Sequence, residues 1–133
     1  MKRVLASAFA VALVAMLGVA SYAGDPVGDI SLEDLKKAIA EKKVTLIDCN
    51  GADSYKKGHI PGAIDFSAAK DDLAKHLPED KTALVVAYCG GPKCNAYKAG
   101  AAAAQKLGYT NVKHFSGGSS GWTAGGEQLK AAE

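Results

Sequence analysis

The sequence predicts an α/β domain of three layers, in which helices flank a largely parallel, five-stranded sheet. Apolar runs rich in β-branched residues, such as 44–48 and 84–88, alternate with segments of helical spacing. Short turns containing Gly or Pro separate these segments, and no internal repeat or interdomain linker is visible. Alternation of strand and helix favours parallel pairing, because each helix can return the chain to the same end of the sheet.

Helices are predicted from caps, spacing and stop signals. Ser31 with an acid three residues on is a variant capping box, and apolar residues then recur at helical spacing. Ser67 is a second candidate cap, with Leu73 and Leu77 pointing inward before Pro78. Gly108 is suited to end the Ala-rich segment before it. The expected helices are 32–41, 53–57, 67–75 and 95–107.

Four of the strands can be placed, at 44–48, 63–66, 84–88 and 112–115, where short apolar runs lie between turn signals. Outside these elements, we expect a loosely tied start at 24–28 and a flexible loop at 117–121. Trp122 is expected to plug the core behind that loop, and 127–132 to form a last short helix.

The first 23 residues have the pattern of a signal peptide. Met1-Lys2-Arg3 is basic, 4–20 is an uncharged apolar run, and Ser21-Tyr22-Ala23 supplies the small residues of a cleavage site. We therefore expect cleavage after Ala23, leaving an exported, periplasmic domain of residues 24–133 without a membrane attachment. An uncleaved anchor is the alternative, since about 17 apolar residues can just span a bilayer.

Loss of the leader would bring the charge close to neutral. The full chain has 16 basic and 14 acidic side chains, and Lys2 and Arg3 belong to the leader. The remaining lysines are scattered in doublets such as Lys36-Lys37, which are typical of solvated faces. No basic block indicates a nucleic-acid partner.

The stretch from Tyr88 to Asn95 carries the strongest chemical signal. A cysteine, Cys89, ends a buried strand, and a Gly/Pro loop leads directly into a helix. Loop N–H groups and the positive end of the helix favour the thiolate and hold an anion beside it. We therefore expect Cys89 to be catalytic, with a substrate-binding loop of Gly90, Gly91, Pro92, Lys93, Cys94 and Asn95.

Asp48 ends the neighbouring strand, at the sheet edge where ligands of parallel α/β domains bind. We expect it either to brace the loop or to cap the turn that follows. His59, in a Gly-Pro turn, is expected to be structural.

Three motifs in order resemble the rhodanese-like domain family. They are Leu46-Ile47-Asp48 with 58–63, the Cys89 segment with its six-residue loop, and 107–112 with Gly121-Trp122. The resemblance covers about residues 29–126. It implies a sulfurtransferase that carries a persulfide on Cys89 and needs no metal or organic cofactor. The implied partners are a thiosulfate or polysulfide donor and a thiol or cyanide acceptor.

The chain departs from the family pattern at its charged positions. Asn50 and Ser54 stand where the family often has Arg and Glu, and Gly90 and Cys94 replace the two arginines of its loop. Lys93 is therefore the candidate for holding donor anions. Related cysteine phosphatases use a seven-residue loop ending in Arg, whereas position seven here is Asn95, so phosphatase activity is not expected.

The cysteines leave a second class of function open. Cys49, Cys89 and Cys94 make an odd count, although exported domains usually pair their cysteines. Their spacing does not fit a zinc site. Cys94 can be a resolving thiol, a disulfide partner or a small loop residue, and Cys49 is expected near the same sheet edge. The alternatives to sulfur transfer are a periplasmic thiol–disulfide protein using Cys89 and Cys94, and a non-catalytic sulfur-carrier module.

Overall fold

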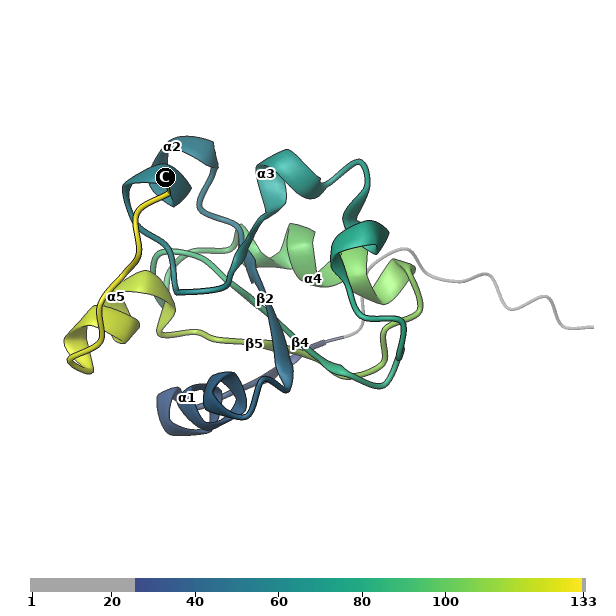
Figure 1. Cartoon of the computed structure of the whole chain (residues 1–133), viewed down its shortest axis with the longest axis horizontal. Helices are drawn as coiled ribbons and strands as arrows, with labels where there is room; N and C mark the ends of the chain where they lie inside the picture. Colours follow the sequence, from purple (N-terminus) through teal and green to yellow (C-terminus); the bar gives the residue numbers. More distant parts are fainter. Residues whose placement is uncertain (1–25, 133) are drawn as a thin grey trace, which may run out of the picture.

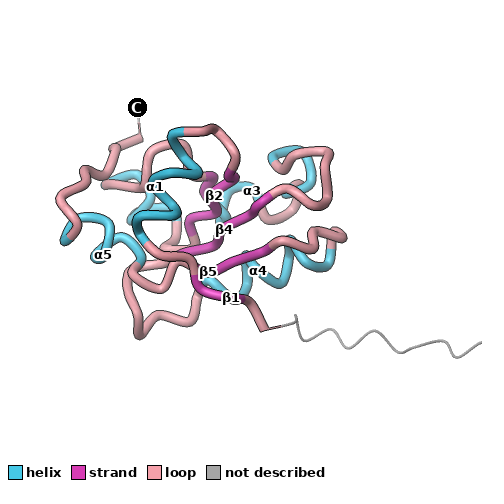
Figure 2. The backbone as a smooth tube through the Cα atoms, turned by 90° about the horizontal axis from the view of Figure 1, so that it is seen from below, coloured by secondary structure: helices cyan, strands magenta, loops and turns pink. Residues whose placement is uncertain are grey.

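The computed structural model describes residues 26–132 and shows a five-stranded parallel sheet with helices on both faces. The strands are β1 (Gly28–Asp29), β2 (Val44–Asp48), β3 (Ile64–Asp65), β4 (Leu84–Tyr88) and β5 (Val112–His114). Their order in the sheet is β1-β5-β4-β2-β3, so β4 is central. Figure 2 shows them running side by side between the helices. The predicted fold class is confirmed, and the expected signal peptide lies outside the described residues.

The helices form a layer on each side of the sheet (Figure 1). They are α1 (Leu32–Ala40), α2 (Ala52–Lys57), α3 (Phe66–Ala69), η1 (Leu73–His76), α4 (Tyr97–Lys106) and α5 (Gly118–Ala124). On one face Leu35 of α1 and Trp122 of α5 pack against Val86 and Tyr88. On the other, Ala101 and Ala104 of α4, with Leu73 of η1, pack against Val85 and Ala87. Two apolar cores therefore hold the central strand.

The strongest sequence signals are confirmed. β2 and β4 have the expected bounds, and Ser31 caps α1 by accepting the backbone N–H of Asp34 at 3.1 Å. Gly108, with φ of +98°, follows the end of α4. Trp122 is buried and donates its indole N–H to the carbonyl of Gln128 at 3.0 Å, so it is the expected core plug.

The helix expected over 67–75 is wrong, because the segment forms α3 and the separate 3-10 turn η1. The cap is Asp65 rather than Ser67, since its carboxylate accepts the Ser67 N–H at 3.0 Å. Adjacent acids at Asp71 and Asp72 are unfavourable at the negative end of a helix, and they coincide with the break. Leu73 and Leu77 still point inward as predicted.

The C-terminal predictions are also wrong. Residues 117–121, expected as a flexible loop, contain the start of α5, and 127–132 is not helical. Instead, the backbone N–H groups of His59 and Lys130 donate to each other's carbonyls at 3.0 and 2.8 Å in an antiparallel bridge. The segment expected as a loose start includes Gly28 of β1, which pairs with β5.

Candidate active site

Cys89 lies at the carboxyl end of the central strand and is almost completely buried, at 1% exposure. Strand β4 brings it there because Val85 to Tyr88 are buried on both faces, which holds the strand in the middle of the sheet. On the neighbouring strand, the N–H of Cys49 donates to the carbonyl of Tyr88 at 2.9 Å. The predicted catalytic residue is thus held by rigid backbone at the ligand-binding edge.

The predicted substrate-binding residues form one continuous loop between β4 and α4. Gly90, Gly91, Pro92, Lys93 and Cys94 line an open hollow of about 440 Å³. Asn95 is exposed beyond it, and α4 begins two residues later than expected, at Tyr97. Among the described residues, the N–H groups of Gly90, Gly91 and Lys93 have no hydrogen-bond acceptor. These donors are available to an anion in the hollow.

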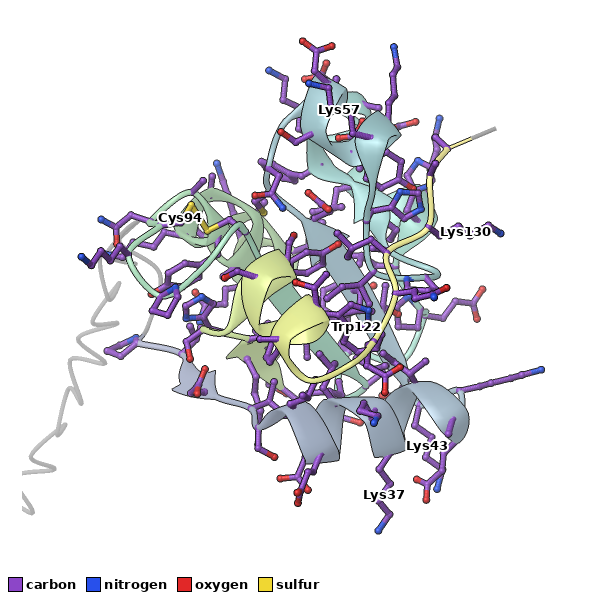
Figure 3. All side chains as sticks on the ribbon, turned by 90° about the vertical axis from the view of Figure 1, so that its left-hand side faces the viewer. Lys37, Lys43, Lys57, Cys94, Trp122 and Lys130 are labelled. Atoms are coloured by element: carbon purple, nitrogen blue, oxygen red, sulfur yellow. A yellow bond between two sulfur atoms is a disulfide. The ribbon has the colours of Figure 1, made fainter. Side chains whose placement is uncertain are left out.

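A disulfide joins Cys89 to Cys94, with their Cα atoms 6.2 Å apart. Figure 3 shows this bond at Cys94, in the loop beside α5. The pairing is one of the alternatives that the sequence left open. In this form neither cysteine is a free thiol, so Cys89 can act as a nucleophile only after the bond is opened.

Asp48 supports the site from beneath the loop. It is fully buried, and its carboxylate accepts the Tyr88 hydroxyl at 2.6 Å and the Asn50 N–H at 2.8 Å. The Tyr88 hydroxyl also accepts the N–H of Ile60 at 2.9 Å. Asp48 therefore caps the turn after β2, as one of the two expectations had it, and fixes the residue before Cys89.

Burial raises the pKa of the Tyr88 hydroxyl far above its usual range, with the hydrogen bond to Asp48 as a further cause. The phenol therefore stays neutral and keeps donating to the carboxylate.

The start of α5 braces the other side of the loop, which the sequence did not predict. The N–H groups of Ser119 and Ser120 donate to the carbonyls of Cys89 and Gly90 at 2.9 and 3.0 Å. Asn50 joins this contact by donating its side-chain amide to the Ser119 hydroxyl at 3.1 Å. A Gly/Ser run signals flexibility in sequence, and only its proximity in the fold assigns it this role.

The charge at the loop is positive and small. Lys93 and Lys98 are exposed, and no acidic side chain occurs between Cys89 and Lys106. An anion that enters the hollow therefore meets no nearby acidic residue from this segment. Lys93 therefore remains the candidate for contacting an anionic sulfur donor.

The thiol of Cys49 is not part of the loop that contains Cys89 and Cys94. It is half-buried under α4, where a Cβ added to Gly100 would lie 2.6 Å from its sulfur. Burial raises the pKa of its thiol to about 12, so the reactive thiolate is scarce at neutral pH. The residue follows Asp48 at the sheet edge as expected, but its thiol packs into the core on the α4 side.

His59 has the structural role that the sequence predicts. His59 stacks on Tyr55 with ring centroids 3.8 Å apart, and its Nδ1 lies 2.9 Å from the Tyr55 carbonyl, as a structural residue should. Across residues 26–132, no group of three or more metal-ligating side chains gathers, and no helix is long and apolar enough to cross a membrane.

Residues 31–125 match the family model of the Rhodanese-like domain. The chain therefore belongs to the rhodanese-like domain family. Cys89, which belongs to the second of the three motifs that carry the resemblance, follows the central strand β4.

One similar protein is considerably longer than this chain. The HTH-type transcriptional regulator Rv0324 of Mycobacterium tuberculosis is 36% identical over 81 residues, which are 59% of this chain and 34% of that protein. This chain thus spans about a third of the length of that relative.

Solved structures share the fold. The BH2092 protein of Bacillus halodurans has 26% identity and a TM-score of 0.60, over 78% of this chain and 77% of that one. The human single-domain sulfurtransferase TSTD1 has 23% identity and a TM-score of 0.58, over 74% of this chain and 97% of that one. SseA of Escherichia coli, described as a 3-mercaptopyruvate sulfotransferase, has 21% identity and a TM-score of 0.61, and the match covers 80% of this chain and 51% of that one.

Proposed function

We propose that this protein is a sulfurtransferase that carries a sulfane sulfur as a persulfide on Cys89. The observation that carries the proposal is the position of Cys89, at the end of the central strand and the base of a loop with unpaired N–H donors. A persulfide is an anion, and such donors stabilise it without any cofactor. Membership of the rhodanese-like family supports the same chemistry.

In the proposed cycle, the reduced Cys89 thiolate attacks the outer sulfur of thiosulfate or a polysulfide. The sulfur–sulfur bond of the donor breaks, and sulfite or a shortened polysulfide leaves with the electron pair. A thiol or cyanide then attacks the outer sulfur of the persulfide and restores the thiolate. Lys93 is proposed to hold the charged donor, because it is the cation of the loop.

The proposed location is the periplasm, reached through a leader of residues 1–23. A disulfide between Cys89 and Cys94 supports an oxidising compartment, since such bonds are rare where glutathione keeps thiols reduced. The mass of the protein recovered from the periplasm tests both points. Cleavage after Ala23 is the expected result.

Mass spectrometry of the reduced protein after incubation with thiosulfate tests the activity. We expect Cys94→Ser, in which Cys89 cannot form the disulfide, to show one added sulfur that cyanide removes as thiocyanate, and Cys89→Ser to show none. Cys49→Ser is the matched control and should form thiocyanate from thiosulfate and cyanide like the wild type. A Cys94→Ser protein that never gains sulfur from thiosulfate or polysulfide, together with a wild type that forms no thiocyanate from cyanide, would overturn the proposal.

A second candidate is a thiol–disulfide protein that exchanges electrons through Cys89 and Cys94, and the disulfide favours it. In that case the protein would oxidise a dithiol substrate and Cys94→Ser would abolish this activity. Sulfur loading on Cys89 that persists in Cys94→Ser would favour the sulfurtransferase instead.

A further inference from the structure

The two cysteines of the loop, Cys89 and Cys94, differ in solvent exposure. Cys89 is 1% exposed and does not line the hollow, whereas Cys94 is half-buried and forms part of its wall. The loop turns back on itself there, because the N–H of Cys94 donates to the Gly91 carbonyl at 3.1 Å. The backbone therefore holds Cys94 against Cys89 at a Cα separation of 6.2 Å, which is typical of disulfides.

Resting on the proposed function, we propose that Cys94 is a second reacting thiol, which attacks a persulfide on Cys89, releases hydrosulfide and closes the disulfide. The bond in the structure joins Cys94 to Sγ of Cys89, and this atom is the inner sulfur of the persulfide. The disulfide form is thus the product of the proposed step.

The step balances without an external oxidant. The Cys94 thiolate forms a bond to Sγ of Cys89, and the bond from Sγ to the outer sulfur breaks. The outer sulfur leaves with the electron pair as hydrosulfide and takes up the proton that the Cys94 thiol lost. Two cysteines are oxidised to a disulfide while one sulfane sulfur is reduced to sulfide.

The surroundings of Cys94 favour this reaction. Its neighbour Lys93 is cationic, which stabilises the attacking thiolate. Hydrosulfide is the conjugate base of a stronger acid than an ordinary thiol, so it leaves more readily. Cys49 cannot replace Cys94, because its thiol packs against Gly100 under α4.

The persulfide on Cys89 can then react in two ways. An acceptor that reaches the hollow first takes the sulfur and leaves both cysteines reduced. Without an acceptor, Cys94 expels the sulfur as hydrosulfide and the site is closed until a thiol reductant opens the disulfide. The protein then converts thiosulfate and its own two thiols into sulfite, hydrosulfide and a disulfide.

A single-turnover experiment tests this fate. Fully reduced wild type, Cys94→Ser, Cys94→Ala and Cys49→Ser are freed of reductant under anaerobic conditions and mixed with thiosulfate without acceptor. A sulfide electrode follows hydrosulfide, and intact mass reports the protein. We expect wild type and Cys49→Ser to release one equivalent and lose two hydrogens, whereas both Cys94 variants release none and retain one added sulfur.

The outcomes separate this inference from the proposed function. Wild type that keeps its persulfide as stably as the Cys94 variants would overturn the role of Cys94 and leave sulfur transfer intact. Absence of loading in all four proteins would overturn the proposed function itself. Loss of hydrosulfide release in Cys49→Ser would assign the attacking thiol to Cys49 and so also overturn the inference.

Discussion

Ser119 donates its backbone N–H to the carbonyl oxygen of Cys89 at 2.9 Å, although 30 residues separate them in the chain. With the parallel bond from Ser120 to Gly90, it ties the first peptide units of the loop to α5. The loop is therefore held from two sides, by Asp48 through Tyr88 and by the start of α5. This arrangement makes α5 part of the scaffold of the candidate active site.

Gly118→Ala should distort the loop. Gly118 has φ of +59°, and an added Cβ would lie 2.3 Å from the Cys89 carbonyl oxygen and 2.7 Å from the Gly91 nitrogen. We expect a loss of about 2–4 kcal/mol in the free energy of unfolding, from backbone strain and overpacking together. Sulfur loading on Cys89, measured in the Cys94→Ser background, should fall as well, because the clash lies at the loop itself.

Gly126→Ala is the matched control for that variant. It has φ of +88° but no atom within 4 Å of an added Cβ, so it should show strain alone, about 1–2 kcal/mol. Urea unfolding gives the stabilities and mass spectrometry gives the loading. Equal losses in the two variants would mean that contact with the loop has no effect.

Tyr88→Phe should destabilise the protein without touching the sulfur chemistry directly. The substitution removes the hydroxyl that donates to the buried Asp48 carboxylate and accepts the Ile60 N–H. Both groups would then be buried without this partner, which costs about 2–4 kcal/mol in the free energy of unfolding.

Tyr55→Phe provides the comparison for Tyr88→Phe. Its hydroxyl donates to the Ala63 carbonyl at 2.7 Å in a half-buried position, so we expect a loss of about 1 kcal/mol. Chemical denaturation of both variants measures the difference. A smaller effect at Tyr88 than at Tyr55 would contradict the supporting role given to Asp48.

The central part of the fold could be predicted because its signals are local. The run 84–88 is uninterrupted and apolar, and 44–48 is rich in β-branched and apolar residues, as a buried parallel strand requires. The loop from Gly90 to Asn95 could be predicted as a unit for the same reason, since its residues are contiguous.

The rest of the site depends on contacts between distant segments. The Gly/Ser run at 117–121 has weak helix propensity, and its helix is held by bonds to Cys89 and Gly90. Strand β1 has only two residues, Gly28 and Asp29, and exists through its pairing with β5. Neither feature has a periodic pattern that a single sequence can display.

Cys49 should resist alkylation while Cys94 of the loop reacts. With its pKa raised to about 12 by burial, about one Cys49 thiol in ten thousand is ionised at pH 8. After reduction of the native protein, iodoacetamide should label Cys94, which lines the hollow, within minutes and Cys49 only after unfolding. Peptide mapping at a series of pH values measures this, and labelling of Cys49 as fast as Cys94 would contradict it.

His114 should make stability fall in mild acid. The side chain is buried, and its Nε2 has no hydrogen-bond partner in residues 26–132. Its ring stacks on that of Tyr97, with the two ring centroids 3.3 Å apart. Burial lowers its pKa from the usual 6.5, while the charge of Asp29 acts weakly in the opposite direction.

The sign follows from proton binding. As pH falls below 6.5, the unfolded chain binds the proton of His114 before the folded chain does, so stability is lost until the lower, folded pKa is passed. His114→Gln should reduce this loss, by up to about 1.4 kcal/mol per pH unit. Urea unfolding of the wild type and His114→Gln between pH 5 and 7 measures the difference, and an equal loss in the two proteins would contradict this role of His114.

Lys93→Gln should weaken the binding of a charged donor. Lys93 is exposed on the wall of the hollow, where an ammonium attracts thiosulfate but is partly screened by water. We expect KM for thiosulfate to rise about three- to tenfold at low ionic strength, with a smaller effect in high salt. Turnover should change little, because Lys93 does not form the persulfide.

Lys37→Gln is the control for Lys93→Gln, since it removes the same charge from α1, well away from Cys94 (Figure 3). Steady-state kinetics at two salt concentrations separate a local contact from a general effect of net charge. If both variants raise KM equally, the donor responds only to overall charge and Lys93 has no special part. A rise confined to Lys93→Gln and reduced by salt would place the donor anion in the hollow beside Cys94.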